Sequence, residues 1–245
     1  MTTSLSLPFI THYSLFILIK SFSSLIFYIC KNFTVELINQ QVQLYAEKFS
    51  SPEDALLQKI NQFTQNHPDA QMLSGHLQGK VLEMLSCMIR PRRILEIGTF
   101  TGYSALCLAK GLTEDGQLHT IEIKEAEAVK AREFFAQSPY ASRIILHLGS
   151  ALDIIPALEE SWDLVFIDAD KPAYVEYFNL VLPKLRKNGF IFADNIFFHG
   201  QVLEQEVKGK NAKGIKEFNE YIQQRKDIEK VILTLRDGLF LIRKL

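Results

Sequence analysis

The sequence lacks the features that mark several common classes of protein. Its 245 residues include 3 cysteines, with no CxxC pair and no Cys/His cluster at zinc spacing. We therefore expect neither a disulfide framework nor a structural zinc site, and we expect a reducing, cytoplasmic location. No charge of one sign predominates, because 27 basic and 28 acidic side chains leave a net charge of -1. This balance favours no polyanion, so we expect no nucleic-acid partner.

Clustered histidines are also lacking. The six histidines are scattered along the chain, and no two of them stand at the sequence spacing of metal ligands. We expect them to be structural or surface groups. They are His12, His67, His76, His119, His147 and His199.

Acidic residues are missing from the start of the chain, where the first Asp or Glu is Glu36. We interpret residues 1–33 as a hydrophobic extension and residues 34–245 as the main domain. Residues 9–30 are long enough to cross a bilayer, but Lys20 lies near their middle, where a charge costs about 2.5 to 3.5 kcal/mol. Membrane contact is therefore not favoured. A weak anchor, a helical extension packed on a partner subunit and translated sequence upstream of the true start all stay open.

Helical patterns and short apolar strands follow one another along the main domain. Three helical patterns come first, at residues 35–49, 51–65 and 74–88, and Pro52 is expected at the first helical position of the second. Five strands rich in Ile, Leu, Val and Phe follow at residues 93–98, 118–123, 144–148, 164–168 and 190–194. The helical patterns between them lie at residues 104–111, 125–137, 151–158 and 174–185.

Strands separated by helices indicate a parallel sheet with helices on both faces, since parallel strands need a crossover connection. The right-handedness of such connections makes the α/β fold doubly wound. Residues 230–236 and 239–244 are two further strands joined at Asp237-Gly238, a dipeptide typical of two-residue hairpins. The sequence therefore predicts a mostly parallel, seven-stranded sheet with a C-terminal antiparallel hairpin and N-terminal helices.

A strand-to-helix turn at residues 95–104 carries the first candidate binding site. Gly98 can bring the backbone close to a ligand because it has no Cβ atom, and Gly102 permits a tight turn before the helix. The spacing is Gly-x-x-x-Gly rather than GxGxxG, and the carboxylate of Glu96 disfavours a pyrophosphate but suits a cationic ligand. Glu122 ends the next strand, where an acid can accept hydrogen bonds from both ribose hydroxyls. Together these features favour a cationic nucleoside.

Asp168, Asp194 and Asn195 form the second candidate site. Each lies where an apolar strand meets its loop, so all three are expected at the carboxyl edge of the sheet. Two carboxylates and an amide oxygen suit a hard divalent cation. Mg²⁺ is the expected ion, with Mn²⁺ and Ca²⁺ as alternatives. For either acid taken alone, a helix cap or an ion pair is the alternative role.

Three sequence blocks resemble the cation-dependent O-methyltransferases of the caffeoyl-CoA and catechol type, namely LEIGTFTGYS, FIDADKPAY and FADN. The similarity covers about residues 33–245 and implies a class I methyltransferase fold, S-adenosyl-L-methionine as cofactor and a homodimer. It assigns metal binding to Asp168, Asp194 and Asn195, and catalysis to Lys171 as the base together with Asp168. It assigns cofactor contacts to Glu96, Gly98, Thr99, Ser104, Glu122, Ala151, Asp168 and Asp170.

The resemblance implies methyl transfer from the sulfonium to a hydroxyl of a small catechol-like substrate. A divalent cation chelated by two adjacent oxygens lowers the pKa of a phenol, so chelation selects vicinal diols. Lys171 can take the proton if the cation and burial lower its own pKa. Residues 196–214 match the acceptor-side lid of the family in position. Residues 74–79 depart from the acidic residue and Gly-Gln of plant members.

Two other functions compete with this interpretation. An NAD-type oxidoreductase uses the same sheet architecture, but the missing GxGxxG pattern and the hairpin at Asp237-Gly238 disfavour it. A non-catalytic module that binds a nucleoside or a metal is expected to have an inert site. The polar residues of a working site are instead all present, at Asp168, Lys171, Asp194 and Asn195.

Overall fold

The computed structural model describes residues 39–245, and within them seven strands form one sheet. The strands are β1 (Arg93–Ile97), β2 (Gln117–Glu122), β3 (Ile144–Leu148), β4 (Trp162–Ile167), β5 (Leu185–Asp194), β6 (Ile228–Leu233) and β7 (Leu239–Lys244). Their order is β3-β2-β1-β4-β5-β7-β6; β1 to β5 are parallel, and β7 is antiparallel to both β5 and β6. The predicted fold class is confirmed.

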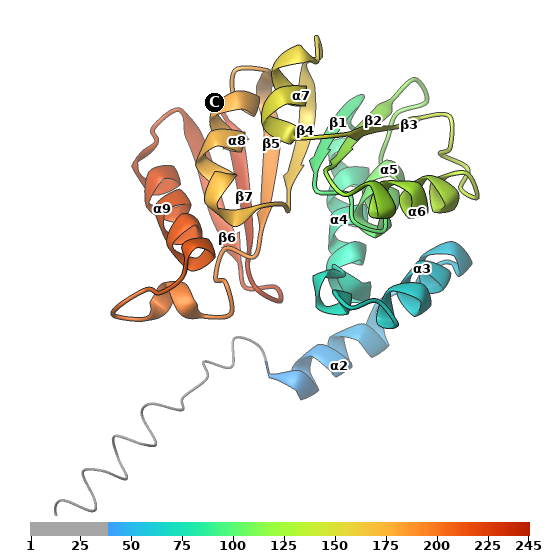
Figure 1. The fold of residues 1–245 in the computed structure, drawn as a ribbon, viewed down its shortest axis with the longest axis horizontal. Coiled ribbons are helices and arrows are strands. Elements are labelled where there is room, and N and C mark those ends of the chain that lie inside the picture. The colour runs from blue at the N-terminus through green and yellow to red at the C-terminus, as the bar shows by residue number, and fades with distance from the viewer. Residues whose placement is uncertain (1–38) are drawn as a thin grey trace, which may run out of the picture. The chain divides into compact units, whose positions relative to one another are not determined.

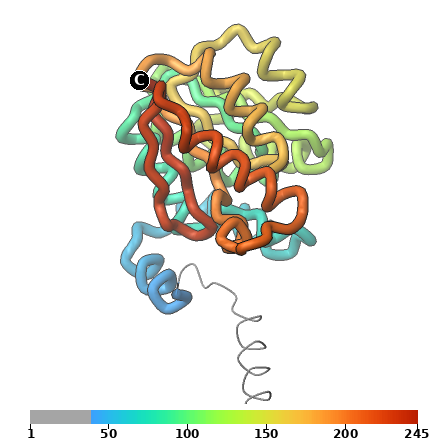
Figure 2. The backbone as a smooth tube through the Cα atoms, turned by 90° about the vertical axis from the view of Figure 1, so that its left-hand side faces the viewer, coloured from blue at the N-terminus to red at the C-terminus, as the bar shows by residue number. Residues whose placement is uncertain are grey.

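Helices connect the strands and cover the sheet. They are α2 (Gln40–Phe49), α3 (Ala55–Gln65), α4 (Gly75–Ile89), α5 (Tyr103–Ala109), α6 (Glu125–Phe135), α7 (Ala151–Ala157), α8 (Tyr174–Val181) and α9 (Lys210–Gln224). Figure 1 shows α5 and α6 beside β1 to β3, and α8 and α9 beside β4 to β7. Figure 2 shows the two C-terminal strands, coloured red, running side by side.

Two apolar layers hold the helices to the sheet, because neighbouring strand residues point to opposite faces. On β1, Leu95 and Ile97 are buried in the layer formed with α7, α8 and α9. Ile94 is buried in the layer formed with α3, α4, α5 and α6. Burial on both faces fixes the register of the central strands, and therefore the positions of the residues that follow their carboxyl ends.

The strand order reverses at β1, which lies between β2 and β4. The chain moves outward from β1 to β3 and then returns to the other side of β1 as β4. At the carboxyl ends, the Gly98 amide donates to Ile121 O at 3.0 Å and the Asp168 amide donates to Ile97 O at 2.9 Å. Open α/β sheets bind ligands at such a reversal, so the fold places Gly98 and Asp168 where a ligand is expected.

The second helix begins later than predicted. Pro52 was expected at its first helical position, but α3 begins at Ala55. Asp54 is the N-cap, and its side chain accepts hydrogen bonds from the amides of Leu56 at 3.1 Å and Leu57 at 2.9 Å. The prediction was wrong because a capping carboxylate satisfies two free amides of the first turn, which proline cannot do.

The C-terminal hairpin is present, but its turn is longer than predicted. Strand β6 ends at Leu233, which pairs with Leu239, so five residues connect the strands instead of two. The Gly238 amide donates to Leu235 O at 2.8 Å, and Arg236 has a φ of 48°. Arg236 lies outside the ladder, and its guanidinium donates to the carbonyl oxygen of Leu73 at 2.8 Å.

Helix α9 is missing from the sequence predictions, and its start at Lys210 falls inside the predicted lid, residues 196–214. Its buried Ile215, Phe218 and Ile222 repeat at helical spacing, and this pattern is the signal that could have revealed it. The remaining lid residues contain a short 3₁₀ turn, η3 (Gln201–Leu203).

The predicted extension, residues 1–33, and the candidate membrane segment, residues 9–30, lie outside the described residues. The boundary between the extension and the main domain therefore stays a prediction. Among the helices of residues 39–245, none has the length and apolar character that a membrane crossing requires.

Candidate active site

The polar residues singled out in the sequence gather at the carboxyl edge of the central strands. Glu96 lies near the end of β1, Glu122 and Asp194 are the last residues of β2 and β5, and Asp168 directly follows β4. Because these strands are parallel and adjacent, their carboxyl ends share one edge. The expected gathering of strand-end acids at this edge is therefore present.

Gly98 lies against the first residue after β4. It has a φ of 99°, and a Cβ atom built on it would lie 2.0 Å from the backbone oxygen of Asp168. No side chain fits at that distance, so the two turns can approach only with glycine at this position. The turn after β1 at residues 98–102, called the glycine turn below, therefore lies directly against the turn that begins at Asp168.

Glu96 is fully buried beneath the glycine turn, with 0% of its surface exposed. Its Oε1 accepts a hydrogen bond from the Ser104 hydroxyl at 2.6 Å, and its Oε2 accepts one from the Thr120 hydroxyl at 2.5 Å. Burial, together with the negative charges of Asp168 and Glu122, raises the pKa of Glu96 to about 8, although the hydrogen bonds from Ser104 and Thr120 oppose the change. In the ligand-free chain, Glu96 is therefore mostly protonated at neutral pH.

The raised pKa of Glu96 predicts a loss of stability as pH rises. The folded-state pKa is above the unfolded-state value of 4.5, so the stabilising contribution is complete below pH 4.5 and is lost as pH rises toward 8. Relative to Glu96→Gln, the free energy of unfolding of the wild type should fall across this window by on the order of 4 kcal/mol. Urea unfolding at pH 5 and pH 8 measures the difference; parallel curves for the two proteins would contradict the assignment.

Backbone amides hold the carboxylate of Glu122 in place. Its Oε2 accepts from the Phe100 amide at 2.8 Å, and its Oε1 accepts from the amides of Ile123 at 3.0 Å and Lys124 at 2.9 Å. Phe100 belongs to the glycine turn, so one of these bonds ties the end of β2 to that turn. The acid is thereby fixed beside the glycine turn, as a ribose-binding residue must be.

The other predicted cofactor residues lie around the same edge. The Thr99 hydroxyl is 2.5 Å from the Thr120 hydroxyl, and Ser104 is the donor to Glu96 described above. Ala151 is the first residue of α7, which follows β3. Asp170 is exposed and precedes η2 (Lys171–Ala173). All four positions follow or adjoin the carboxyl ends of β1, β3 and β4, and their contacts with a cofactor stay predictions.

Lys171 lies among the predicted metal-binding residues. Its Nζ donates to Asp168 Oδ1 at 2.7 Å, to Asn195 Oδ1 at 2.8 Å and to the Tyr174 hydroxyl at 2.8 Å. Two of the three predicted ligand oxygens therefore converge on one positive charge. A site that attracts an ammonium group between its oxygens has the donors that a hard cation requires.

Asp194 is the last residue of β5 and precedes Asn195 in the chain. It is 2% exposed; its Oδ2 accepts from Gln78 Nε2 at 2.6 Å and its Oδ1 accepts from the Asn195 amide at 2.8 Å. Burial and, to a smaller extent, the charge of Asp168 raise the pKa of Asp194 to about 6, although Lys171 and the hydrogen bonds from Gln78 and Asn195 oppose the change. Lys171 therefore offsets only part of the effect that burial and Asp168 have on this pKa.

The charge state of Lys171 differs from the one that a base needs. Burial lowers the pKa of its ammonium group, but the negative charges of Asp168 and Asp194 outweigh burial and raise that pKa above its usual value. Proton transfer to Lys171, as predicted from the sequence, requires its pKa to be lowered. The difference arises because the fold places Lys171 beside the negative charges of Asp168 and Asp194.

Sequence reasoning missed three contributors to this cluster. Gln78, on α4, donates to Asp194; Tyr174, the first residue of α8, accepts from Lys171; Arg236 reaches the start of α4 from the C-terminal hairpin. Tyr174 stands in the quoted FIDADKPAY block, so its proximity could have been inferred. Gln78 and Arg236 are 158 positions apart, and no sequence spacing links them.

Within residues 39–245, no three His, Cys, Asp or Glu side chains lie together in a way that could hold a metal ion. The candidate cluster has two carboxylates and takes its third oxygen from the amide of Asn195. All of its donor atoms are oxygens, and its two carboxylates carry a charge of -2 when both are ionised. Such donors suit a hard divalent cation better than a soft one.

Two of the scattered histidines meet in the fold. His119 on β2 and His147 on β3 lie with Nδ1 and Nε2 3.1 Å apart, and their rings stack at 5.2 Å. Neighbouring strands bring them together although 28 residues separate them. Burial lowers the pKa of both imidazoles, that of His119 to about 4. Their structural role agrees with the expectation, but their separation in sequence did not predict the contact.

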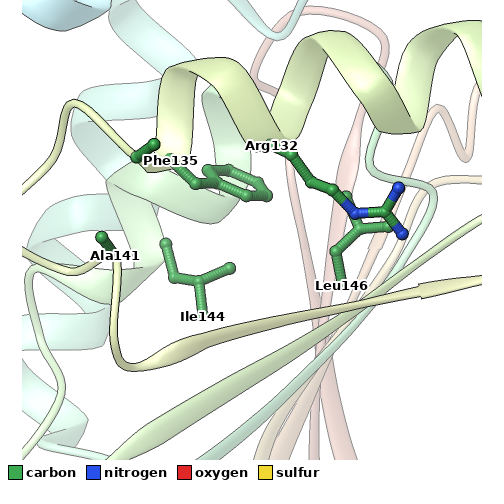
Figure 3. Close-up of a pocket in the computed structure, with 6 residues that line it drawn as sticks. Arg132, Phe135, Ala141, Ile144 and Leu146 are labelled. Carbon is green, nitrogen blue, oxygen red and sulfur yellow. The ribbon is translucent and has the colours of Figure 1, made fainter.

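A shallow pocket lies away from this edge, between α6 and β3. It has a volume of about 310 Å³ and is lined by Arg132, Phe135, Ala136, Ala141, Ile144 and Leu146. Figure 3 shows Arg132 and Phe135 on the helix above Ile144 and Leu146. The lining includes no carboxylate, hydroxyl or amide side chain that could take part in proton transfer. The candidate active site is therefore the polar cluster at the carboxyl edge.

Comparisons with known proteins agree with this geometry. The sequence matches the family model described as O-methyltransferase over residues 47–245. It is 33% identical over 187 residues to a catechol O-methyltransferase of Niastella koreensis, covering 75% of this chain and 84% of that protein. It is 28% identical over 214 residues to probable caffeoyl-CoA O-methyltransferase 2 of Dictyostelium discoideum, covering 84% and 93%. The crystal structure of the O-methyltransferase TomG from Streptomyces achromogenes in complex with SAM has a TM-score of 0.77 and 33% identity, covering 83% and 96%.

Proposed function

The chain belongs to the O-methyltransferase family, and we propose that it uses S-adenosylmethionine to methylate a hydroxyl of a small catechol-like substrate. The single observation that carries this proposal is the convergence of Asp168 Oδ1 and Asn195 Oδ1 on Lys171 Nζ. Because Gly98 packs against Asp168, this cluster adjoins the turn proposed to bind the cofactor. Donor and acceptor sites therefore share a wall.

The cofactor is proposed to lie along the glycine turn. Glu122 is held by backbone amides in a position to accept hydrogen bonds from ribose hydroxyls. Gly98 lets the turn after β1 pack directly against the backbone of Asp168, which brings the proposed cofactor-binding turn next to the proposed cation site. Support for this cofactor comes from TomG, a family member crystallised with SAM.

The residues proposed to hold a divalent cation are Asp168, Asp194 and Asn195. They fit such an ion because their oxygens are hard donors, and because Asp168 Oδ1 and Asn195 Oδ1 converge on one ammonium group. When bound, the cation supplies positive charge that lowers the pKa of a chelated phenol and so favours its reactive anion. Mg²⁺ is the proposed ion, with Mn²⁺ and Ca²⁺ as alternatives.

Lys171 is proposed to take the proton of the substrate hydroxyl at Nζ. The charges of Asp168 and Asp194 hold its pKa high, so Lys171 releases its proton more readily wherever these charges are compensated. The Tyr174 hydroxyl and Asn195 Oδ1 fix the position of Nζ through hydrogen bonds of 2.8 Å. Positioning of this kind favours proton transfer without movement of the backbone.

Vicinal diols are the proposed substrates, since two adjacent oxygens can chelate one ion. An assay with S-adenosylmethionine and matched catechols and monophenols tests this: the catechols should be methylated and their monophenol counterparts should not, as measured by formation of S-adenosylhomocysteine. Equal rates for the two classes would contradict the proposed substrate class while leaving the family unaffected. The homodimer and the cytoplasmic location stay predictions.

A further inference from the structure

Gln78 is a buried amide that contacts a predicted metal ligand from outside the strand ends. It lies on α4, is 1% exposed, and donates from Nε2 to Asp194 Oδ2 at 2.6 Å. Asp194 Oδ1 accepts from the Asn195 amide, so each oxygen of this carboxylate has one fixed donor. A carboxylate held at both oxygens cannot rotate about its terminal bond without breaking a hydrogen bond.

Arg236 determines which end of the Gln78 amide faces Asp194. Its Nη1 lies 3.3 Å from Gln78 Oε1 and also donates to the carbonyl oxygens of Leu73, at 2.8 Å, and Ser74. A guanidinium group has only donors, so the amide must present its oxygen to Arg236. The NH₂ group of Gln78 is then left for Asp194, and the donor and acceptor roles are mutually consistent along the whole chain of contacts.

This chain of contacts links three distant parts of the sequence at one point. Arg236 comes from the connection between β6 and β7, Gln78 from α4, and Asp194 from the end of β5. The donor that reaches Asp194 is neutral, so it orients the carboxylate without adding a charge that would repel a cation. Partners that orient metal ligands typically change metal affinity by roughly 10- to 100-fold when they are removed.

We propose that Gln78, oriented by Arg236, is a positioning residue for Asp194 and that this pair sets the affinity of the site for a divalent cation. The inference rests on the proposed cation site. Beyond that site, Gln78 and Arg236 gain a role although neither belongs to the strand-end cluster. Gln78 is neither a ligand nor a group that touches the substrate, and it acts only through the carboxylate of Asp194.

The test is a direct titration of the chelator-treated, full-length protein with Mn²⁺, followed by electron paramagnetic resonance and without any substrate. Gln78→Met keeps the length of the side chain but removes both hydrogen bonds. It should raise the dissociation constant for Mn²⁺ by roughly 10- to 100-fold. Arg236→Met should weaken it in the same direction. The double variant should be no weaker than Gln78→Met alone, because both act through one amide.

Ser86→Ala is the matched control, since Ser86 is a fully buried polar residue on the same helix that donates to Leu108 O at 2.6 Å. It should keep wild-type Mn²⁺ affinity although it loses a buried hydrogen bond. Binding of S-adenosylmethionine without metal, within about twofold of wild type, shows that Gln78→Met is folded. If that variant does not fold, Arg236→Met decides instead.

Mn²⁺ affinity within twofold of wild type in the folded variant would overturn the inference while leaving the proposed function standing. Additive losses in the double variant would overturn the role of Arg236 through Gln78. A wild-type protein that binds no Mn²⁺ would overturn the proposed cation site and this inference together, so the two failures are distinguishable.

Discussion

Lys171→Met should lower kcat for methylation of a catechol by about 10²- to 10⁴-fold, the range typical of a lost general base. Met is similar in length but cannot accept or donate a proton. Affinity for S-adenosylmethionine should stay within a few-fold of wild type, because Lys171 is not among the proposed cofactor contacts. Steady-state rates and calorimetric titration with the cofactor measure both quantities.

The same substitution should not weaken cation binding. Lys171 Nζ donates to Asp168 Oδ1 and Asn195 Oδ1, so its removal leaves both oxygens available to a cation. It also leaves the negative charge of Asp168 without this ion pair. The control is Lys130→Met, since Lys130 forms a surface ion pair with Glu133. Unaltered turnover in Lys171→Met would exclude Lys171 as the base.

Gly98→Ala should abolish cofactor binding and destabilise the fold. The added Cβ atom would lie 2.0 Å from Asp168 O, and φ at this position is 99°, so alanine must displace the turns after β1 and β4. The strained backbone alone costs about 1 to 3 kcal/mol. Thermal unfolding with and without S-adenosylmethionine measures the loss: the variant should melt earlier, and the cofactor should no longer raise its melting temperature.

Gly209→Ala separates strain from crowding in this experiment. Gly209 also has a positive φ, of 79°, but a Cβ atom there would meet no other atom within 4 Å. This variant should be mildly destabilised and should still be stabilised by the cofactor. A Gly98→Ala protein that binds the cofactor as Gly209→Ala does would contradict the proposed path of the cofactor along the glycine turn.

The sequence allowed the placement of the strand-end residues to be predicted for a physical reason. Short apolar strands alternating with helices leave a parallel sheet as the arrangement that buries both faces, and parallel strands end at one edge. Asp168 and Asp194 directly follow or end such strands, so their proximity follows from the topology. Strand β3 and strand β7 have the predicted bounds, 144–148 and 239–244.

Contacts between distant segments could not be predicted in the same way. Gln78 meets Asp194 and Arg236 only because α4 packs beneath the C-terminal hairpin connection, and neither residue has a local pattern that signals it. The raised pKa of Lys171 likewise depends on charges assembled by the fold. The turn at Asp237-Gly238 was predicted to be two residues long from local turn propensity. That propensity carries no information about the contact between Arg236 and the distant Leu73.

Methyl transfer is proposed to depend on a divalent cation held by oxygens of Asp168, Asp194 and Asn195. Methylation of a catechol by protein treated with a chelator, then titrated with Mg²⁺, tests it most directly. We expect the rate to fall to background with the chelator and to return in full as Mg²⁺ is added. A rate that is undiminished in excess chelator would contradict the claim.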